Sequence, residues 1–336
     1  MNIKEIQFVA LKEARLVDKT LPDEIGPNQV LSRTIYTIIS SGTEKANILD
    51  LPNTFAYGKW PKVEGYDAIS VVEKVGADVK KVKVGDRVLV YHGTHANYSL
   101  VDESRVYPVK ENIKDEEAVL TIIGAMGICG LRKTRLELGE SNMVIGLGLL
   151  GMFALMTARN IGAYPLIAVD FNEQRRKLAL ELGADYAFDP RDVDFVQKVK
   201  DVTAGKGVDT IVEVTGSGRA LESALAVVAK EGRIALSGCT RINDVKIDWY
   251  KQVHCPGITI IGAHNSARPK CDSSNGNWTN EDDVHALCKM IAGKRFDVTK
   301  LVNEIHSPNE CFEIYQRLVY DEDFPLGVLF DWRLLK

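Results

Sequence analysis

The chain has 336 residues, of which 45% are hydrophobic and 26% charged, and its formal net charge is −4 at pH 7. That length suffices for two domains of about 100–200 residues each. The mild negative charge and the absence of a long Lys/Arg run argue against nucleic-acid binding. The most apolar run, residues 143–158, is interrupted by glycines and is too short to span a membrane.

The start of the chain and its cysteines point to a reducing compartment. Residues 1–6 lack the apolar stretch of a secretory signal. The six cysteines form no C-x-x-C pair and no Cys/His cluster with metal-finger spacing. We therefore expect reduced thiols and a cytoplasmic location, with no partner among membranes or nucleic acids.

Residues 1–118 are dominated by short strand patterns separated by turns. The clearest strands are 30–39, 69–75 and 87–91, each rich in β-branched residues and followed or preceded by Gly, Asp or Ser. Alternating apolar residues between such turns predict a compact, mostly antiparallel β domain.

From residue 119 the pattern changes to alternating strands and helices. Strands are predicted at 143–145, 165–169, 210–214, 233–236 and 258–261, with helices at 149–160, 173–182 and 221–229. This alternation predicts an α/β fold in which residues 119–295 form a doubly wound parallel sheet. The segment 296–336, with a helix at 308–318 and a strand at 327–331, is expected to pack back on the first domain.

A glycine loop lies between the first strand and helix of this second domain. Gly146-x-Gly148-x-x-Gly151 follows an apolar strand and opens an apolar helix, as a dinucleotide-binding loop requires. The glycines permit the tight turn, the approach of the pyrophosphate, and close helix–strand packing. The backbone N–H groups at Leu149 and Leu150 would face the phosphates.

Asp170 ends the next strand, 19 positions after Gly151. A carboxylate there can accept the adenosine-ribose hydroxyls and repel a 2′-phosphate, so NAD is favoured over NADP. Arg175 and Arg176 are the counter-argument, because a nearby arginine can pair with that phosphate.

Several segments in order resemble the medium-chain dehydrogenase/reductases, the zinc-type alcohol dehydrogenase superfamily. They include Ser41-Gly42-Thr43-Glu44, Gly65-Tyr66-Asp67, Val84-Gly85-Asp86-Arg87-Val88, the glycine loop, and Gly232-Arg233 through Gly238. The resemblance covers nearly the whole chain. It implies a GroES-like β domain, a Rossmann domain, and a homodimer or homotetramer joined through an edge strand such as 258–261. It also implies cofactor contacts at the later strand ends, from Thr215, Gly216, Ser237 and Ala263.

The departures from that superfamily concern zinc. Members with catalytic zinc usually show Cys-Gly-Thr-Asp and Gly-His-Glu, whereas this chain has Ser41 and Tyr66 at the metal-binding positions. A hydroxyl and a phenol are poor replacements for thiolate and imidazole. No metal is therefore expected, and the pattern resembles the zinc-independent branch that includes bacteriochlorophyllide dehydrogenase-like proteins.

Without zinc, side chains must manage the charge on the substrate oxygen. Hydride transfer to a carbonyl needs a proton or a positioned hydrogen-bond donor at that oxygen. The candidates are Tyr66 as a phenol donor, His95 or the neighbouring His92 as a group that titrates near neutrality, and Glu44 and Asp67 as groups that tune a neighbour.

The predicted function is reversible hydride transfer between NAD(H) and a secondary alcohol or ketone. The polar segment 265–277 suggests a small, hydroxyl-rich substrate such as a sugar or cyclitol. Two alternatives remain open: an NADPH-dependent quinone or enoyl reductase, and a nucleotide-binding protein without catalytic activity.

Overall fold

A computed structural model describes residues 1–335, which form two compact units. The first unit contains Met1–Ile123 together with the segment from Val284 onward, and the second contains Gly124–Asp283. The sequence placed these boundaries at 118 and 295. They differ because two helices, α3 (Thr121–Thr134) and α8 (Asn280–Ala292), continue across the division, so no change of composition marks it.

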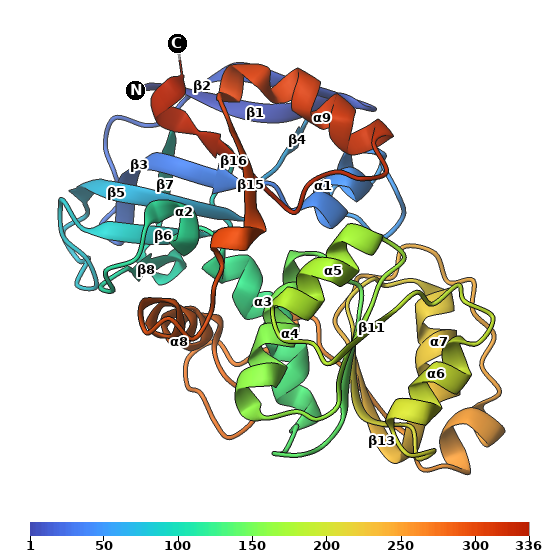
Figure 1. Cartoon of the computed structure of the whole chain (residues 1–336). Helices are drawn as coiled ribbons and strands as arrows, with labels where there is room; N and C mark the ends of the chain where they lie inside the picture. The colour runs from blue at the N-terminus through green and yellow to red at the C-terminus, as the bar shows by residue number, and fades with distance from the viewer. Residues whose placement is uncertain (336) are drawn as a thin grey trace. The chain divides into compact units, whose positions relative to one another are not determined.

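The second unit is built on a six-stranded parallel sheet (Figure 1). Its strand order is β11-β10-β9-β12-β13-β14, which is that of a Rossmann sheet. The chain adds strands outward from β9 on one side and from β12 on the other, so the topological switch point lies between these two parallel strands. The strands are β9 (Asn142–Ile145), β10 (Leu166–Val169), β11 (Tyr186–Phe188), β12 (Val208–Glu213), β13 (Val228–Leu236) and β14 (Thr259–Gly262).

Local sequence explains where the connecting helices begin and end. The helices are α4 (Leu149–Ile161), α5 (Glu173–Glu181), α6 (Phe195–Val202) and α7 (Gly218–Val227). The Asn172 side chain accepts a hydrogen bond from the Arg175 amide at 3.0 Å and so caps α5. Gly162 follows α4 in a left-handed conformation, with φ of 100°.

The first unit holds two sheets, a larger one that is mostly antiparallel and a smaller one of three strands. The smaller sheet has the order β2-β1-β4. The larger sheet runs β15-β16-β3-β5-β6-β8, with β7 also paired to β3. The strands are β1 (Asn2–Ala10), β2 (Glu13–Thr20), β3 (Gln29–Ile38), β4 (Lys62–Val63), β5 (Asp67–Val75), β6 (Arg87–Tyr91), β7 (Tyr98–Asp102), β8 (Val106–Pro108), β15 (Val302–His306) and β16 (Gly327–Asp331). With the parallel sheet, this confirms the predicted α/β fold class.

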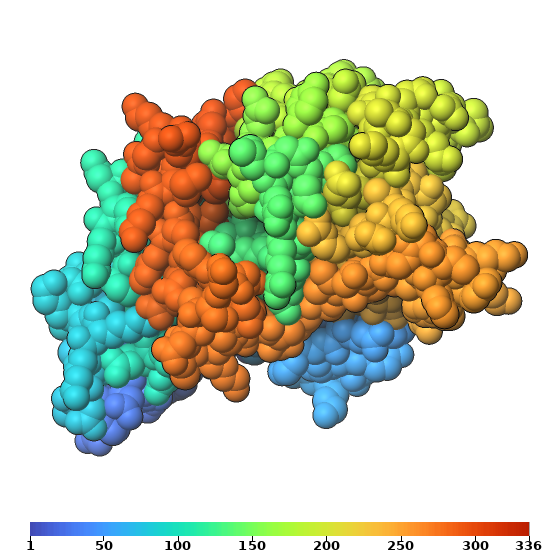
Figure 2. Space-filling view, turned by 90° about the horizontal axis from the view of Figure 1, so that it is seen from below, coloured from blue at the N-terminus to red at the C-terminus, as the bar shows by residue number. Residues whose placement is uncertain are grey.

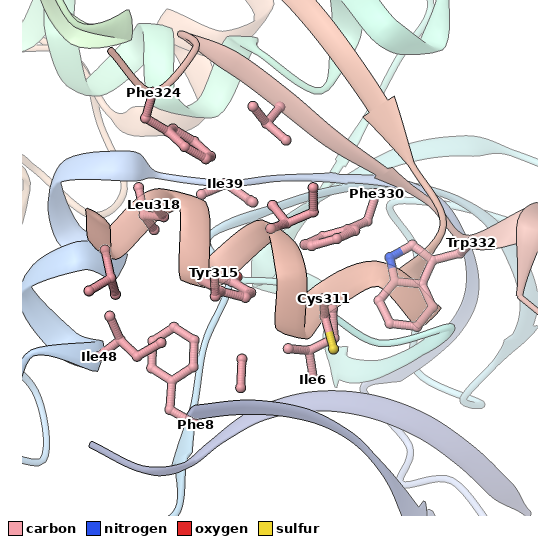
Figure 3. Close-up of a cluster of buried hydrophobic side chains, with 14 residues drawn as sticks. Ile6, Phe8, Ile39, Ile48, Cys311, Tyr315, Leu318, Phe324, Phe330 and Trp332 are labelled. Atoms are coloured by element: carbon pink, nitrogen blue, oxygen red, sulfur yellow. The ribbon is translucent and has the colours of Figure 1, made fainter. Parts of the chain in front are cut away.

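The C-terminal helix α9 (Cys311–Tyr320) lies in the core of the first unit. Figure 3 shows Tyr315 and Leu318 on this helix among other apolar side chains, including Phe8 of β1 and Ile39, which directly follows β3. The strand β16 follows α9 and pairs antiparallel with β3, with Leu329 opposite Ile38. Segments from the two ends of the sequence therefore build one core.

Residues 82–84, before β6, form a loop in which the Lys83 amide donates to Asp86 at 3.0 Å. Within residues 1–335, no helix is long and apolar enough to cross a membrane. All six cysteines are free; Cys239, Cys255 and Cys271 are exposed and the other three are buried.

Candidate active site

The glycine loop has the backbone geometry that its three glycines suggested. Gly146 has φ of 94°, a conformation that side chains disfavour. A Cβ on Gly151 would overlap the carbonyl oxygen of Gly146, so helix α4 can pack here only with glycine. Gly148 caps α4 without any side-chain capping bond, and the space beside its Cα is open. The loop therefore fits a dinucleotide pyrophosphate at a helix N-terminus.

Asp170 is buried against this loop. Its Oδ2 accepts the Leu147 amide at 2.7 Å and its Oδ1 accepts the Asn172 amide at 2.8 Å. Each carboxylate oxygen keeps a second lone-pair direction for a ligand hydroxyl. The carboxylate is thus fixed relative to the glycine loop, where a ribose diol would have to be recognised.

Two arginines near Asp170, Arg176 and Arg191, are paired with Asp189. Arg176 donates to the Asp170 carbonyl oxygen at 2.7 Å and pairs with Asp189 at 3.2 Å. Arg191 also pairs with Asp189, and together they lower the pKa of that carboxyl to about 2. Arg175 belongs to the first turn of α5, where its amide is taken up by the Asn172 cap.

The other expected cofactor contacts lie at the carboxyl ends of β12, β13 and β14. Thr215 is exposed, and its amide and hydroxyl, with the Gly216 amide, bond to the buried Glu213 carboxylate. Ser237 and Ala263 are buried, and the Ser237 hydroxyl has no hydrogen-bond partner. An unpartnered buried hydroxyl at a strand end suits a ligand contact.

Replacing Gly148 with alanine tests where the pyrophosphate sits. In the protein without cofactor the added methyl meets nothing within 4 Å, and the backbone (φ −71°, ψ −174°) suits any residue. We expect thermal stability of the cofactor-free protein to be unchanged, and the dissociation constant for NADH, by fluorescence titration, to rise by about 10–100-fold as the methyl meets phosphate. Gly151→Ala should instead lower stability itself. Unchanged NADH affinity in Gly148→Ala would contradict this cofactor position.

Tyr66 is held by a close approach of two loops in the first unit. Gly65 has φ of 118°, and a Cβ there would overlap the backbone of residues 93–95. This contact brings the half-buried Tyr66 ring to 5.3 Å from the His92 ring, centroid to centroid. The structure therefore places His92, not His95, beside the phenol.

Glu44 and His95 lie together in the fully buried core. Glu44 is in the first turn of α1 (Ser41–Ile48), and its Oε2 accepts the Tyr315 hydroxyl at 2.6 Å and lies 3.2 Å from His95 Nε2. His95 Nδ1 is 2.7 Å from the Thr37 hydroxyl, which accepts the Trp332 indole N–H at 3.0 Å. A neutral histidine protonated at Nε2 satisfies every one of these bonds.

This network holds Glu44 and His95 inside the first unit, where their side chains bond to other buried groups and do not reach solvent. Both side chains are fully shielded from solvent, and the pKa of Tyr315 is raised well above its usual value, first by burial and then by the charge of Glu44. Their predicted direct role in catalysis stays a prediction. Tyr315 and Thr37 were missed, since Tyr315 is 271 positions from Glu44 and no local pattern joins them.

Asp67 and Glu64 are two further buried carboxyls near Glu44. Asp67 Oδ2 accepts the Ile123 amide at 2.8 Å, while Oδ1 has no hydrogen-bond partner. Burial, followed by the charge of Glu44, raises the pKa of Glu64 to about 8; for Asp67 burial also dominates and the pKa is raised well above its usual value. Burial and the charge of Glu44 thus favour the protonated form of both carboxyls.

Glu64 should make stability depend on pH. Between its unfolded pKa near 4.5 and its folded pKa of about 8, the folded chain holds a proton that the unfolded chain releases. The free energy of unfolding should therefore fall as pH rises through this window, by at most about 1.4 kcal/mol per pH unit from this group. Denaturant titrations of Glu64→Gln should show a smaller fall, while the exposed control Glu24→Gln should follow the parent. Identical curves for all three would refute the assignment.

The residues at the superfamily's zinc position do not suit the metal. Ser41 and Tyr66 offer hydroxyl oxygens, and within residues 1–335 no three His, Cys, Asp or Glu side chains are grouped to hold an ion. Because the donor set does not fit, no step of the proposed chemistry passes through zinc.

The polar segment after β14 is largely exposed and forms part of the orange surface in Figure 2. Arg268 is an exception, because its side chain is buried and forms an ion pair with Asp283 at 2.7 Å. Asp283 forms a second ion pair, with Arg132, at 2.6 Å. His264 Nδ1 lies 2.7 Å from the Ser266 hydroxyl. The segment is thus anchored by Arg268 and presents hydroxyl and amide groups outward.

A Rossmann unit with a glycine loop and a buried carboxylate bonded to that loop, joined in one chain to a mostly antiparallel β unit, defines a dinucleotide-dependent oxidoreductase. Residues 37–154 match the alcohol dehydrogenase GroES-like domain and residues 150–274 match the zinc-binding dehydrogenase family. The chain belongs to the zinc-type alcohol dehydrogenase-like medium-chain dehydrogenase/reductase superfamily, and its cofactor is a nicotinamide dinucleotide.

Three comparisons illustrate this membership. L-threonine 3-dehydrogenase of Pyrococcus furiosus is 29% identical over 285 residues, which is 74% of this chain and 79% of the relative. An alcohol dehydrogenase of Cupriavidus necator is 25% identical and covers 90% of this chain and 99% of its own. The fold of galactitol-1-phosphate dehydrogenase from Escherichia coli superimposes with a TM-score of 0.84 at 16% identity, covering 98% of this chain and 99% of that one.

Proposed function

We propose that this protein is an NAD-dependent dehydrogenase that interconverts a secondary alcohol and a ketone of a polyhydroxylated metabolite, without catalytic zinc. The observation that carries the cofactor assignment is Asp170, whose carboxylate is bonded to the Leu147 amide of the glycine loop. A fixed anion at this place favours a ribose diol and repels a 2′-phosphate. The pairing of Arg176 with Asp189 supports the same choice, since it removes one cation from phosphate recognition.

Tyr66 is the proposed proton donor and acceptor at the substrate oxygen. When bound, NAD(H) supplies the hydride acceptor or donor. Tyr66 exchanges its phenol proton with the oxygen that becomes carbonyl or alcohol, which is the work zinc and a base share in other members. Asp67 follows Tyr66 as the first residue of β5, and burial raises the pKa of its carboxyl, which disfavours a negative charge at this point of the chain.

The proposed substrate class rests on the polar surface after β14. A polyol needs several hydrogen-bonding partners, and residues 264–277 provide hydroxyl, amide and imidazole groups at the surface of the second unit. The similarity to relatives that act on amino-acid and sugar alcohols agrees with this class.

The test combines metal content, cofactor preference and a substrate panel on one preparation. We expect less than stoichiometric zinc, turnover untouched by chelator, at least about a tenfold preference for NAD over NADP, and activity on polyols or cyclitols above that on apolar secondary alcohols. Turnover confined to NADPH with a conjugated alkene would favour the reductase alternative. Tight NADH binding with no turnover would favour a non-catalytic role.

We also propose that the protein forms a homodimer or homotetramer through β14. This strand ends the sheet order with one neighbour, β13. Trp249 and Tyr250, on the helical turn Trp249–His254 that precedes β14 in the chain, are more than half exposed. An edge strand can pair with a second copy, and exposed aromatic side chains are suited to an interface. Light scattering on Trp249→Glu should show a smaller species than on the parent chain.

A further inference from the structure

His92 is a non-glycine residue in a left-handed conformation directly beside the proposed proton donor. Its φ is 53°, and it follows the last residue of β6. Such a conformation is unfavourable for a residue other than glycine and persists only where the surrounding contacts hold it.

Arg105, from the short helical turn Glu103–Arg105, holds the backbone around His92. Its Nε donates to the Tyr91 carbonyl at 3.0 Å, and its guanidinium also donates to the His92 carbonyl. The imidazole contacts two tyrosine rings, with centroids 4.1 Å from that of Tyr91 and 5.3 Å from that of Tyr66. The imidazole thus contacts both phenol rings, and His92 is exposed to solvent.

The charges around His92 favour its neutral form. The titratable groups that face it are Tyr66 before β5, Tyr91 on β6 and Arg105, with Tyr107 and Lys81 one layer behind Tyr91. Desolvation by these neighbours, followed by the positive charge of Arg105, lowers the pKa of His92 from its usual value. A neutral imidazole is able to accept a proton at neutral pH.

We propose that His92 is a positioning residue that orients the Tyr66 phenol and takes up the proton that this phenol releases during alcohol oxidation. This inference rests on the proposed function. The alcohol O–H bond breaks and its proton passes to the Tyr66 oxygen, while the phenol's own proton moves to His92 and then to water. The C–H bond breaks as its electron pair leaves with the hydride to NAD⁺, so ketone, NADH and one proton result.

His95 does not compete for this role. Both of its ring nitrogens lie within hydrogen-bond distance of buried partners, Thr37 and Glu44, and its side chain is shielded from solvent. His92 differs on both points, because its ring contacts that of Tyr66 and the residue is exposed to water.

Two variants of His92 separate proton uptake from packing. His92→Phe keeps a ring between the tyrosines but cannot take a proton, and His92→Asn suits the left-handed backbone without a ring. His254→Phe is the matched control, since His254 is also exposed and lies 5.6 Å from a tyrosine ring, that of Tyr250.

The first measurement is an NMR titration of the histidines, which needs no turnover. We expect the His92 resonance, identified by its loss in His92→Asn, to titrate below about pH 6.5 and to shift in Tyr66→Phe. A His92 titration that Tyr66→Phe leaves unchanged would overturn the pairing. A shift without turnover on any alcohol would uphold the pairing and sink only the proposed dehydrogenase function.

The second measurement is the pH profile of kcat for oxidation. We expect the parent to lose kcat as pH falls through the His92 titration, and His92→Phe to lose about tenfold in kcat with a flatter profile and an unchanged KM for NAD. Tyr66→Phe combined with His92→Phe should be no slower than Tyr66→Phe alone. If His92→Phe keeps the parental kcat and profile, as His254→Phe should, the proposal is wrong.

Discussion

Replacing Tyr66 with phenylalanine is expected to lower kcat by about 10²–10⁴-fold, the range that general acid–base catalysis contributes. The phenol is the proposed source of the proton at the substrate oxygen, and the residues around it do not suit zinc, which would otherwise stabilise that charge. The dissociation constant for NADH should stay within about twofold, because the glycine loop belongs to the second unit. Steady-state rates and fluorescence titration of NADH measure the two quantities.

Tyr98→Phe is the control for removing a phenol hydroxyl from the same unit. Tyr98 lies on β7, is half-buried, and has its pKa raised by desolvation and by Glu73, yet it has no proposed part in the reaction. It should keep the parental kcat. If Tyr66→Phe also stays within about threefold of the parent, Tyr66 is not the proton donor and another group must be sought.

Replacing Glu44 with alanine is expected to cost about 3–5 kcal/mol of folding free energy, the usual cost of removing one member of a buried polar network. The Tyr315 hydroxyl, the Ser40 amide and the His95 imidazole would each lose the acceptor that Glu44 provides. Urea denaturation of the first unit, followed by the fluorescence of Trp332 within the same network, should report the loss.

Two further variants identify what Glu44 does. Tyr315→Phe removes one bond to Glu44 and should cost about 1–2 kcal/mol, while Glu313→Ala, exposed on the same helix α9, should cost little. If Glu44→Ala unfolds like Glu313→Ala but loses kcat, Glu44 acts directly in catalysis, as its position in the sequence first suggested.

The elements that follow from local chemistry could be predicted from the sequence. The helix α5 was expected from Asn172 and Gly183, and both its cap and the left-handed glycine are present. The strand β6 was predicted with the observed bounds. By contrast, β1 and β2 were missed, because their alternation of apolar and charged residues is weak and their pairing is set by register with each other.

Part of the candidate site could likewise be predicted from local sequence, and part could not. The sequence alone indicated the glycine loop and Asp170, because positive φ, close helix packing and a carboxylate at a strand end are local requirements that only certain residues meet. It also selected Tyr66, through a departure from the superfamily's metal position.

Only the tertiary structure decided the surroundings of those residues. It placed His95 and Glu44 in the core with Tyr315. The hydrogen bond from the Tyr315 hydroxyl to Glu44 joins residues that are 271 positions apart in the sequence. It placed His92 against Tyr66, through the close approach of Gly65 to residues 93–95. Burial and charge depend on neighbours from distant segments, so the raised pKa values of Glu64 and Asp67 follow from the folded packing and not from their place in the sequence.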